Sequence, residues 1–141
     1  MLESALAANA GRLPVVAGTA HCTTSGAVEL ARHAEAAGAD AMLVVPSYYM
    51  APTPAQVMVH YRRIAEAVSI PTVLYHNVPL TAVDLKTDHL AKLFEEGAIG
   101  GVKMSNSEPD RIYELLQATG GRLKIYAGID TVAFEGRAIA S

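Results

Sequence analysis

The apolar positions of the chain gather in five short runs rich in valine, isoleucine, leucine and methionine. These runs occupy residues 13–19, 41–46, 71–77, 100–105 and 124–130. Such runs are typical of strands that are buried on both faces of a parallel sheet. Their starts recur about every 25 to 30 residues, which is the period of a strand followed by a crossover helix, so we expect five consecutive βα units.

Helical patterns fill the gaps between the runs. Apolar residues recur at helical spacing in residues 27–40, 54–68, 88–97 and 109–121. Thr24 and Ser25 are candidate N-caps of the first helix, and Gly38 is its expected terminator. Pro54 suits the first turn of the second helix. No hairpin signal separates the runs, which places the chain in the α/β class.

Two architectures fit consecutive βα units: an open doubly wound sheet and a (β/α)₈ barrel, also called a TIM barrel. The doubly wound sheet requires a glycine-rich phosphate loop, whereas residues 17–26 carry only Gly18 and Gly26, at the wrong spacing. A barrel gathers polar and reactive side chains at the carboxyl ends of its strands. Here those ends carry Thr19, Ser47, Tyr48, Tyr75, His76, Asn77, Lys103, Ser105 and Asp130. The sequence therefore predicts a TIM barrel.

Lys103 is the residue that the strand pattern explains least. It stands in GGVKMS, between Val102 and Met104, where a doubly buried strand requires apolar side chains. A lysine attacks a ketone only as the neutral amine, and an ordinary pKa of about 10.4 leaves very little amine at neutral pH. Burial in an apolar barrel lowers the pKa of a lysine, so an enclosed Lys103 has a chemical use as a nucleophile.

Composition and charge exclude several classes of function. The chain is 51% hydrophobic and carries 11 Lys+Arg against 14 Asp+Glu, with no basic cluster among aromatic residues, so no nucleic-acid partner is expected. Its single cysteine, Cys22, excludes an intrachain disulfide, and His21 beside it gives too few ligands for a metal site. Without a signal peptide or an apolar run of about 18 residues, we expect no membrane segment and a cytoplasmic protein.

A series of short motifs resembles the dihydrodipicolinate synthase/N-acetylneuraminate lyase family of class I, Schiff-base-forming aldolases. The motifs are collinear with that family over nearly the whole chain. They are AGT (17–19), AGADAMLVVPSYY (37–49), HYRRIAEA (60–67), LYHNVP (74–79), VDL (83–85), GVKMS (101–105) and AGID (127–130). No single motif is decisive, but their order and spacing together identify the family.

The resemblance implies a pyruvate-type lyase or aldolase that acts on a 2-keto acid and an aldehyde, both small molecules. Lys103 matches the lysine that condenses with the keto group, and Tyr75 matches the tyrosine that relays protons. Tyr48, Asn77 and Ser105 are the expected substrate-binding residues. The covalent imine with lysine is the electron sink, so neither a metal nor another cofactor is expected, and the full-length protein is expected to be a homo-oligomer.

Each of these residues also has a purely structural interpretation. Lys103 is alternatively a strand-end lysine that reaches solvent, and Tyr75 a core tyrosine whose hydroxyl is satisfied locally. The pair formed by Tyr48 and Tyr49 matches family tyrosines near the site and the subunit contact, yet packing explains it equally well. The catalytic interpretation of Lys103 and Tyr75 therefore depends on the collinear resemblance.

Two departures from the family pattern limit the expected activity. The family's G-T-[TS]-G-E loop, which binds the pyruvate carboxylate, has no counterpart, and the resemblance covers barrel strands three to seven alone. We therefore expect residues 1–141 to form a single partial TIM-barrel domain. Leu80 stands close to the position where the synthase branch has an arginine for the second substrate's carboxylate. The alternative function is a catalytically inactive truncated remnant or an assembly partner of the family.

Overall fold

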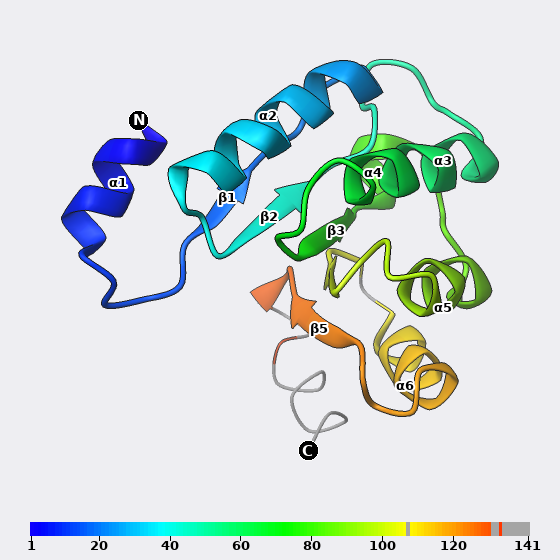
Figure 1. The fold of residues 1–141 in the computed structure, drawn as a ribbon. Helices are drawn as coiled ribbons and strands as arrows, with labels where there is room; N and C mark the ends of the chain where they lie inside the picture. The colour runs from blue at the N-terminus through cyan, green and yellow to red at the C-terminus, as the bar shows by residue number, and fades with distance from the viewer. Residues whose placement is uncertain (107, 131–132, 134–141) are drawn as a thin grey trace.

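The computed structural model describes residues 1–106, 108–130 and 133 of the chain (Figure 1). Its centre is a sheet of five parallel strands that lie side by side in chain order. The strands are β1 (Val16–Gly18), β2 (Ala41–Val44), β3 (Thr72–His76), β4 (Gly101–Met104) and β5 (Lys124–Ala127). Each lies within one of the five apolar runs, so the predicted strands are confirmed.

Six helices accompany the strands in the described residues. They are α1 (Leu2–Asn9), α2 (Thr24–Ala37), α3 (Pro54–Ala65), α4 (Val78–Thr81), α5 (Thr87–Glu95) and α6 (Pro109–Ala118). The four long helical patterns of the sequence correspond to α2, α3, α5 and α6. The single turn α4 is predicted by neither the apolar pattern nor the resemblance, because it is too short to show a helical period.

The helix ends follow capping chemistry. Thr23, rather than the expected Thr24 or Ser25, is the N-cap of α2, and its hydroxyl accepts the Gly26 N–H at 3.2 Å. Gly38 ends α2 in the left-handed region at φ 89°, as predicted, because glycine enters that region without a Cβ penalty. Pro54 opens α3, also as predicted.

The two faces of the sheet differ in burial. Val102 and Met104 are buried against the helices, so Lys103 between them points to the opposite face. Figure 1 shows α2, α3, α5 and α6 following one another along the outer side of the strands, and consecutive members of this series are in contact. The opposite face is more open, since Val16 and Tyr126 on the edge strands are 52% and 48% exposed.

This arrangement decides between the two predicted architectures. A doubly wound sheet reverses its strand order and carries helices on both faces. Here the strands follow chain order and the long helices lie on one face, which is the arrangement of successive units of a TIM barrel. The barrel prediction is therefore confirmed for five consecutive strands and the helices between them. In the part of the chain that the structure describes, no helix combines the length and the apolar content needed to cross a bilayer.

The core lies between the strands and the outer helices. Alanines of α2 are fully buried there, which lets this helix approach the sheet closely. The main cluster includes Met42, Val44, Leu74, Val102 and Met104 from the strands and Ala31, Val57, Tyr61, Ile64, Leu90, Leu93, Ile112 and Leu115 from the helices. This core holds β3 and β4 in register and so fixes the positions of the polar side chains at their carboxyl ends.

Candidate active site

Tyr75 and Lys103 lie opposite each other on the neighbouring strands β3 and β4. Paired residues of a parallel ladder point to the same face, so both side chains stand on the face away from the helices. The Lys103 ammonium nitrogen lies 4.5 Å from the centre of the Tyr75 ring. The two residues that the sequence predicts as the reacting pair are thus adjacent near the carboxyl ends of their strands, the edge where barrel active sites form.

Lys103 is half-buried rather than fully enclosed in the described part of the chain. Its neighbour on the other side is Tyr126 of β5, which pairs with it in register and is 48% exposed. The Tyr126 ring also covers Gly101, because a Cβ built on that glycine would lie 3.1 Å from the ring. The apolar strand pattern predicts an enclosed lysine and does not single out Tyr126. The position of Tyr126 in the last apolar run is the signal that could have revealed it.

The phenol oxygen of Tyr75 has polar neighbours that favour its ionised form. The side-chain amide of Asn77 donates a hydrogen bond to it at 2.9 Å. The pKa of Tyr75 is lowered from its ordinary value, first by the Ser105 hydroxyl, then by the Asn77 amide, and also by the positive charge of Lys103. Ser105 lies close enough to act on the phenol, although no hydrogen bond of ordinary geometry joins the two among the described residues.

The predicted substrate-binding residues occupy different positions. Asn77 and Ser105 lie beside Tyr75, at the ends of β3 and β4. Tyr48 lies in the loop after β2 and is 51% exposed, and the Cys22 side chain raises the pKa of its phenol. Among the described residues, no hydrogen bond joins Tyr48 to Tyr75 or Lys103. The structure thus brings four of the five predicted residues together.

A partly buried ionic cluster lies on the helix side of the same end of the sheet, and no pattern in the sequence predicts it. His76 is buried there, its Nε2 lies 3.5 Å from Asp84 Oδ1, and burial lowers the pKa of its imidazole. Arg111 of α6 pairs with both Asp84 and Glu108. The cluster borders a hollow of about 300 Å³ that Ser105 also lines. Asp84 and Arg111 are 27 positions apart, so no local sequence signal links them.

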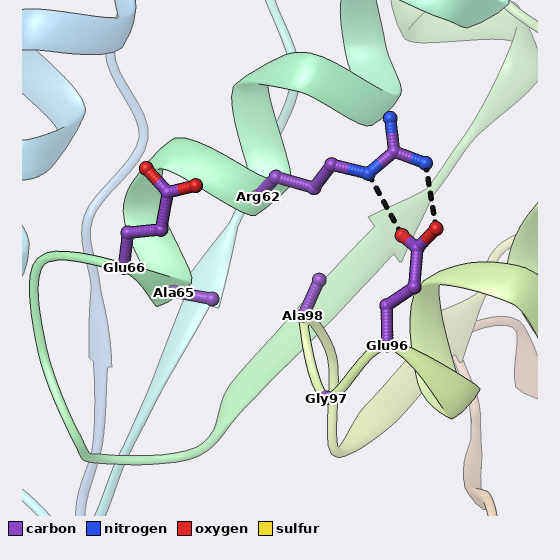
Figure 2. A pocket seen from close by; sticks show the side chains of 6 residues that line it. All are labelled: Arg62, Ala65, Glu66, Glu96, Gly97 and Ala98. Carbon is purple, nitrogen blue, oxygen red and sulfur yellow. Dashed lines mark hydrogen bonds and ion pairs between the residues drawn. The ribbon is translucent and has the colours of Figure 1, made fainter.

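A second hollow lies at the amino-terminal end of the strands, where α3 leads into β3 and α5 leads into β4. Figure 2 shows its lining, in which the Arg62 guanidinium donates two hydrogen bonds to the Glu96 carboxylate, at 2.7 and 3.0 Å. Both residues precede the amino ends of strands, and conserved chemistry in barrels lies at the carboxyl ends. We therefore assign this ion pair to the joining of α3 and α5.

The described residues also bear on metal binding. Across residues 1–106, 108–130 and 133, no three histidine, cysteine or acidic side chains lie close enough together to hold a metal ion. The polar groups at the ends of β3 and β4 are an amine, a phenol, an amide and a hydroxyl. This set suits the formation of a covalent bond by an amine together with proton transfer by a phenol.

The strand order, with long helices along one face of the sheet, defines a protein of the TIM-barrel class. Residues 1–139 match the model of the Dihydrodipicolinate synthetase family, and the chain belongs to that family. The resemblance found in the sequence is therefore confirmed.

Curated relatives agree with this assignment. The chain is 44% identical over 126 residues to 4-hydroxy-tetrahydrodipicolinate synthase of Thioalkalivibrio sulfidiphilus, with 89% of the chain and 43% of the relative covered. It is 40% identical over 133 residues to the synthase of Methylobacterium radiotolerans, with 94% of the chain and 44% of the relative covered. The chain thus spans less than half the length of the curated relatives that it matches.

Solved structures of the family likewise match this chain over about half of their own length. Dihydrodipicolinate synthase from Aquifex aeolicus matches with a TM-score of 0.92 at 34% identity, over 98% of this chain and 47% of that one. The chloride-inhibited dihydrodipicolinate synthase from Acinetobacter baumannii, complexed with pyruvate, matches with a TM-score of 0.94 at 36% identity, again over 98% of this chain and 47% of that one. The chain therefore corresponds to about half of such a barrel.

Proposed function

We propose that this chain supplies the imine-forming site of a lyase or aldolase that acts on a 2-keto acid. The observation that carries the proposal is the placement of the Lys103 amine 4.5 Å from the centre of the Tyr75 ring, on paired residues of adjacent barrel strands. Membership of the Dihydrodipicolinate synthetase family and the pyruvate bound to the Acinetobacter baumannii relative support the same chemistry.

The reaction begins when the neutral amine of Lys103 adds to the keto carbon. The keto oxygen takes up two protons, one released by the amine nitrogen and one from an acid, and leaves as water, which yields a protonated imine on the lysine nitrogen. That cation accepts the electron pair when an adjacent carbon loses a proton or when a carbon–carbon bond breaks. Tyr75 is the proposed carrier of protons to and from the departing oxygen, because its phenol both donates and accepts hydrogen bonds and lies beside the amine.

The proposed substrates are a 2-keto acid of the pyruvate type and an aldehyde. Ser105 and Tyr48 are the proposed substrate contacts, Ser105 beside the reacting pair and Tyr48 from the exposed loop after β2. Leu80 on α4 is half exposed, and no arginine stands in residues 74–85. Arg111, behind the same edge, is engaged by Asp84 and Glu108. The lack of a free arginine near Leu80, in the part of the chain that the structure describes, favours an aldehyde substrate that presents no carboxylate to this part of the site.

Trapping of the imine tests the proposal. The protein is incubated with pyruvate and sodium borohydride, and peptide mass spectrometry locates the reduced adduct. We expect the adduct on Lys103 and its loss in Lys103→Ala. Lys124→Ala is the matched control, since Lys124 is an exposed lysine of the neighbouring strand β5 and its removal should leave trapping intact. An adduct that persists in Lys103→Ala excludes Lys103 as the nucleophile.

The second candidate is a chain of this family that does not turn over. The observation that favours it is the open face of the sheet, where Tyr126 beside Lys103 is 48% exposed and water has access. Imine trapping and turnover separate the candidates, because a non-catalytic chain gives at most a trapped adduct. The turnover assay incubates the protein with a panel of aldol adducts, each formed from a 2-keto acid and an aldehyde, and measures the release of either component. Release that is lost in Lys103→Ala identifies the chain as an enzyme.

A further inference from the structure

Asn77 is fixed at both ends of its side-chain amide. Its Oδ1 accepts the backbone N–H of Leu80 at 3.1 Å, which makes Asn77 the N-cap of α4. Its Nδ2 donates to the phenol oxygen of Tyr75 at 2.9 Å. A backbone N–H can only donate, so the amide oxygen must face Leu80 and the amide nitrogen must face the phenol. The phenol oxygen is therefore the acceptor in this contact.

The strand geometry explains why Asn77 reaches Tyr75. Side chains two positions apart along an extended chain lie on the same side, and the residue between them points the other way. Tyr75 and Asn77 are two positions apart, whereas His76 between them is buried on the helix side near Asp84. The turn that follows holds Asn77 in place, since the Thr81 hydroxyl donates to the Asn77 carbonyl at 2.9 Å.

We propose that Asn77 is a positioning residue, which holds the Tyr75 phenol as a hydrogen-bond acceptor beside Lys103 through an amide anchored by α4. This role differs from the substrate contact that the sequence suggests for Asn77. Its consequence for catalysis rests on the proposed function, because a phenol that accepts from Asn77 keeps its own O–H available to donate toward Lys103 and the substrate.

The charged surroundings of the phenol agree with this role. Among the described residues, Lys103 of β4 is the charged group that faces Tyr75, while Ser105 and Asn77 are uncharged. All three lower the pKa of Tyr75, with Ser105 the largest cause, so removal of the Asn77 donor alone should reverse only part of the shift.

Two variants separate the donor of Asn77 from its capping oxygen. Asn77→Asp keeps an oxygen for the Leu80 N–H but has no N–H for the phenol. Asn77→Ser keeps a capping hydroxyl that is too short to reach the phenol and adds no charge. We expect the pKa of Tyr75 to rise in Asn77→Ser and to rise further in Asn77→Asp, where a negative charge is also added.

The measurement is NMR titration of the protein labelled with ¹³C at the ζ carbon of tyrosine, and Tyr75→Phe assigns the signal. A Tyr75 pKa that stays unchanged in both variants overturns the proposal. The wild-type protein provides a test without substitution, since the Asn77 side-chain amide signals should titrate with the pKa of Tyr75. If these signals do not follow that ionisation, the proposal is likewise overturned.

This experiment is independent of the imine chemistry. If Lys103 forms no adduct with pyruvate but the Asn77 amide titrates with Tyr75, the proposed function fails and the positioning role stands. If the adduct forms but the Asn77 amide signals do not follow the ionisation of Tyr75, the proposed function stands and the positioning role fails. If both hold, we expect the pH dependence of imine trapping to shift upward in Asn77→Ser by the same amount as the pKa of Tyr75.

Discussion

Arg111 on α6 holds both carboxylate oxygens of Asp84, which lies in the segment between α4 and α5. The Asp84 side chain also pairs with Lys86, and Arg111 is 13% exposed. The guanidinium holds the pKa of Asp84 well below its ordinary value, first through its hydrogen bonds and then through its charge. The pair thus joins α6 to the segment that follows β3, the strand that carries Tyr75, on the helix side of the candidate site.

Replacement of Asp84 should lower stability in a manner that depends on pH. We expect Asp84→Asn to reduce the free energy of unfolding by about 1–2 kcal/mol at pH 7, because Arg111 loses its main partner while both side chains retain some access to solvent. A depressed carboxyl pKa stabilises the folded state above the unfolded pKa of about 4, and this contribution is lost as the pH falls toward the folded pKa. The deficit of the variant should therefore shrink below pH 4.

Urea denaturation at several pH values measures this deficit. Glu95→Gln is the matched control, since Glu95 pairs with Arg122 on the exposed surface and its loss should have little effect. A deficit for Asp84→Asn that stays constant from pH 7 to pH 2 contradicts the assignment of the stability to this ion pair.

Position 128 requires glycine, because its backbone passes very close to β4. A Cβ at this position would lie 2.0 Å from Ser105 Oγ and 2.7 Å from the Met104 carbonyl oxygen, and the backbone atom cannot move aside without disturbing the ladder. We expect Gly128→Ala to lower the free energy of unfolding by about 1–3 kcal/mol. Gly18→Ala is the control, because nothing lies within 4 Å of a Cβ built there. Equal stability of the two variants in thermal denaturation would refute this prediction.

Tyr61 anchors α3 to β2 through a buried hydrogen bond. Its ring is fully buried, and its hydroxyl donates to the Val44 carbonyl at 2.7 Å. We expect Tyr61→Phe to cost about 1–2 kcal/mol, because the substitution leaves a buried carbonyl without that donor. Tyr113→Phe, at a tyrosine that is 55% exposed, should be close to neutral in the same urea denaturation. A neutral Tyr61→Phe would show that another donor or a water satisfies Val44.

The sequence predicts the strands and the long helices because their signals are local. Each strand is a short apolar run, and the end of α2 at Gly38 and the start of α3 at Pro54 follow from backbone preferences of single residues. The exact N-cap is less certain from sequence, because Thr23, Thr24 and Ser25 all carry capping hydroxyls and only the fold decides among them. The turn α4 lies in a segment too short for any period.

The candidate site is predictable only in part. Adjacent βα units place Tyr75 and Lys103 on neighbouring strands, but the register that pairs them is set by packing of the core. The contact between Asp84 and Arg111 requires α6 to meet the segment between α4 and α5 in space, which spacing along the chain does not encode. The exposure of Lys103 likewise depends on what covers the open face of the sheet, and local sequence carries no information on that.

Tyr75→Phe tests the relay directly, because it removes the phenol oxygen and leaves the ring beside Lys103. General acid–base catalysis contributes a factor of about 10² to 10⁴, so we expect the rate of imine trapping with pyruvate to fall by at least about 10²-fold while Lys103 remains the site of the adduct. Stability should change little, since the Tyr75 side chain is half-buried and its oxygen bonds to the side chain of Asn77. Tyr126→Phe is the matched control on the other side of Lys103, and its trapping rate should match the wild type. An unchanged rate in Tyr75→Phe would assign proton transfer to another group and leave Tyr75 with packing alone.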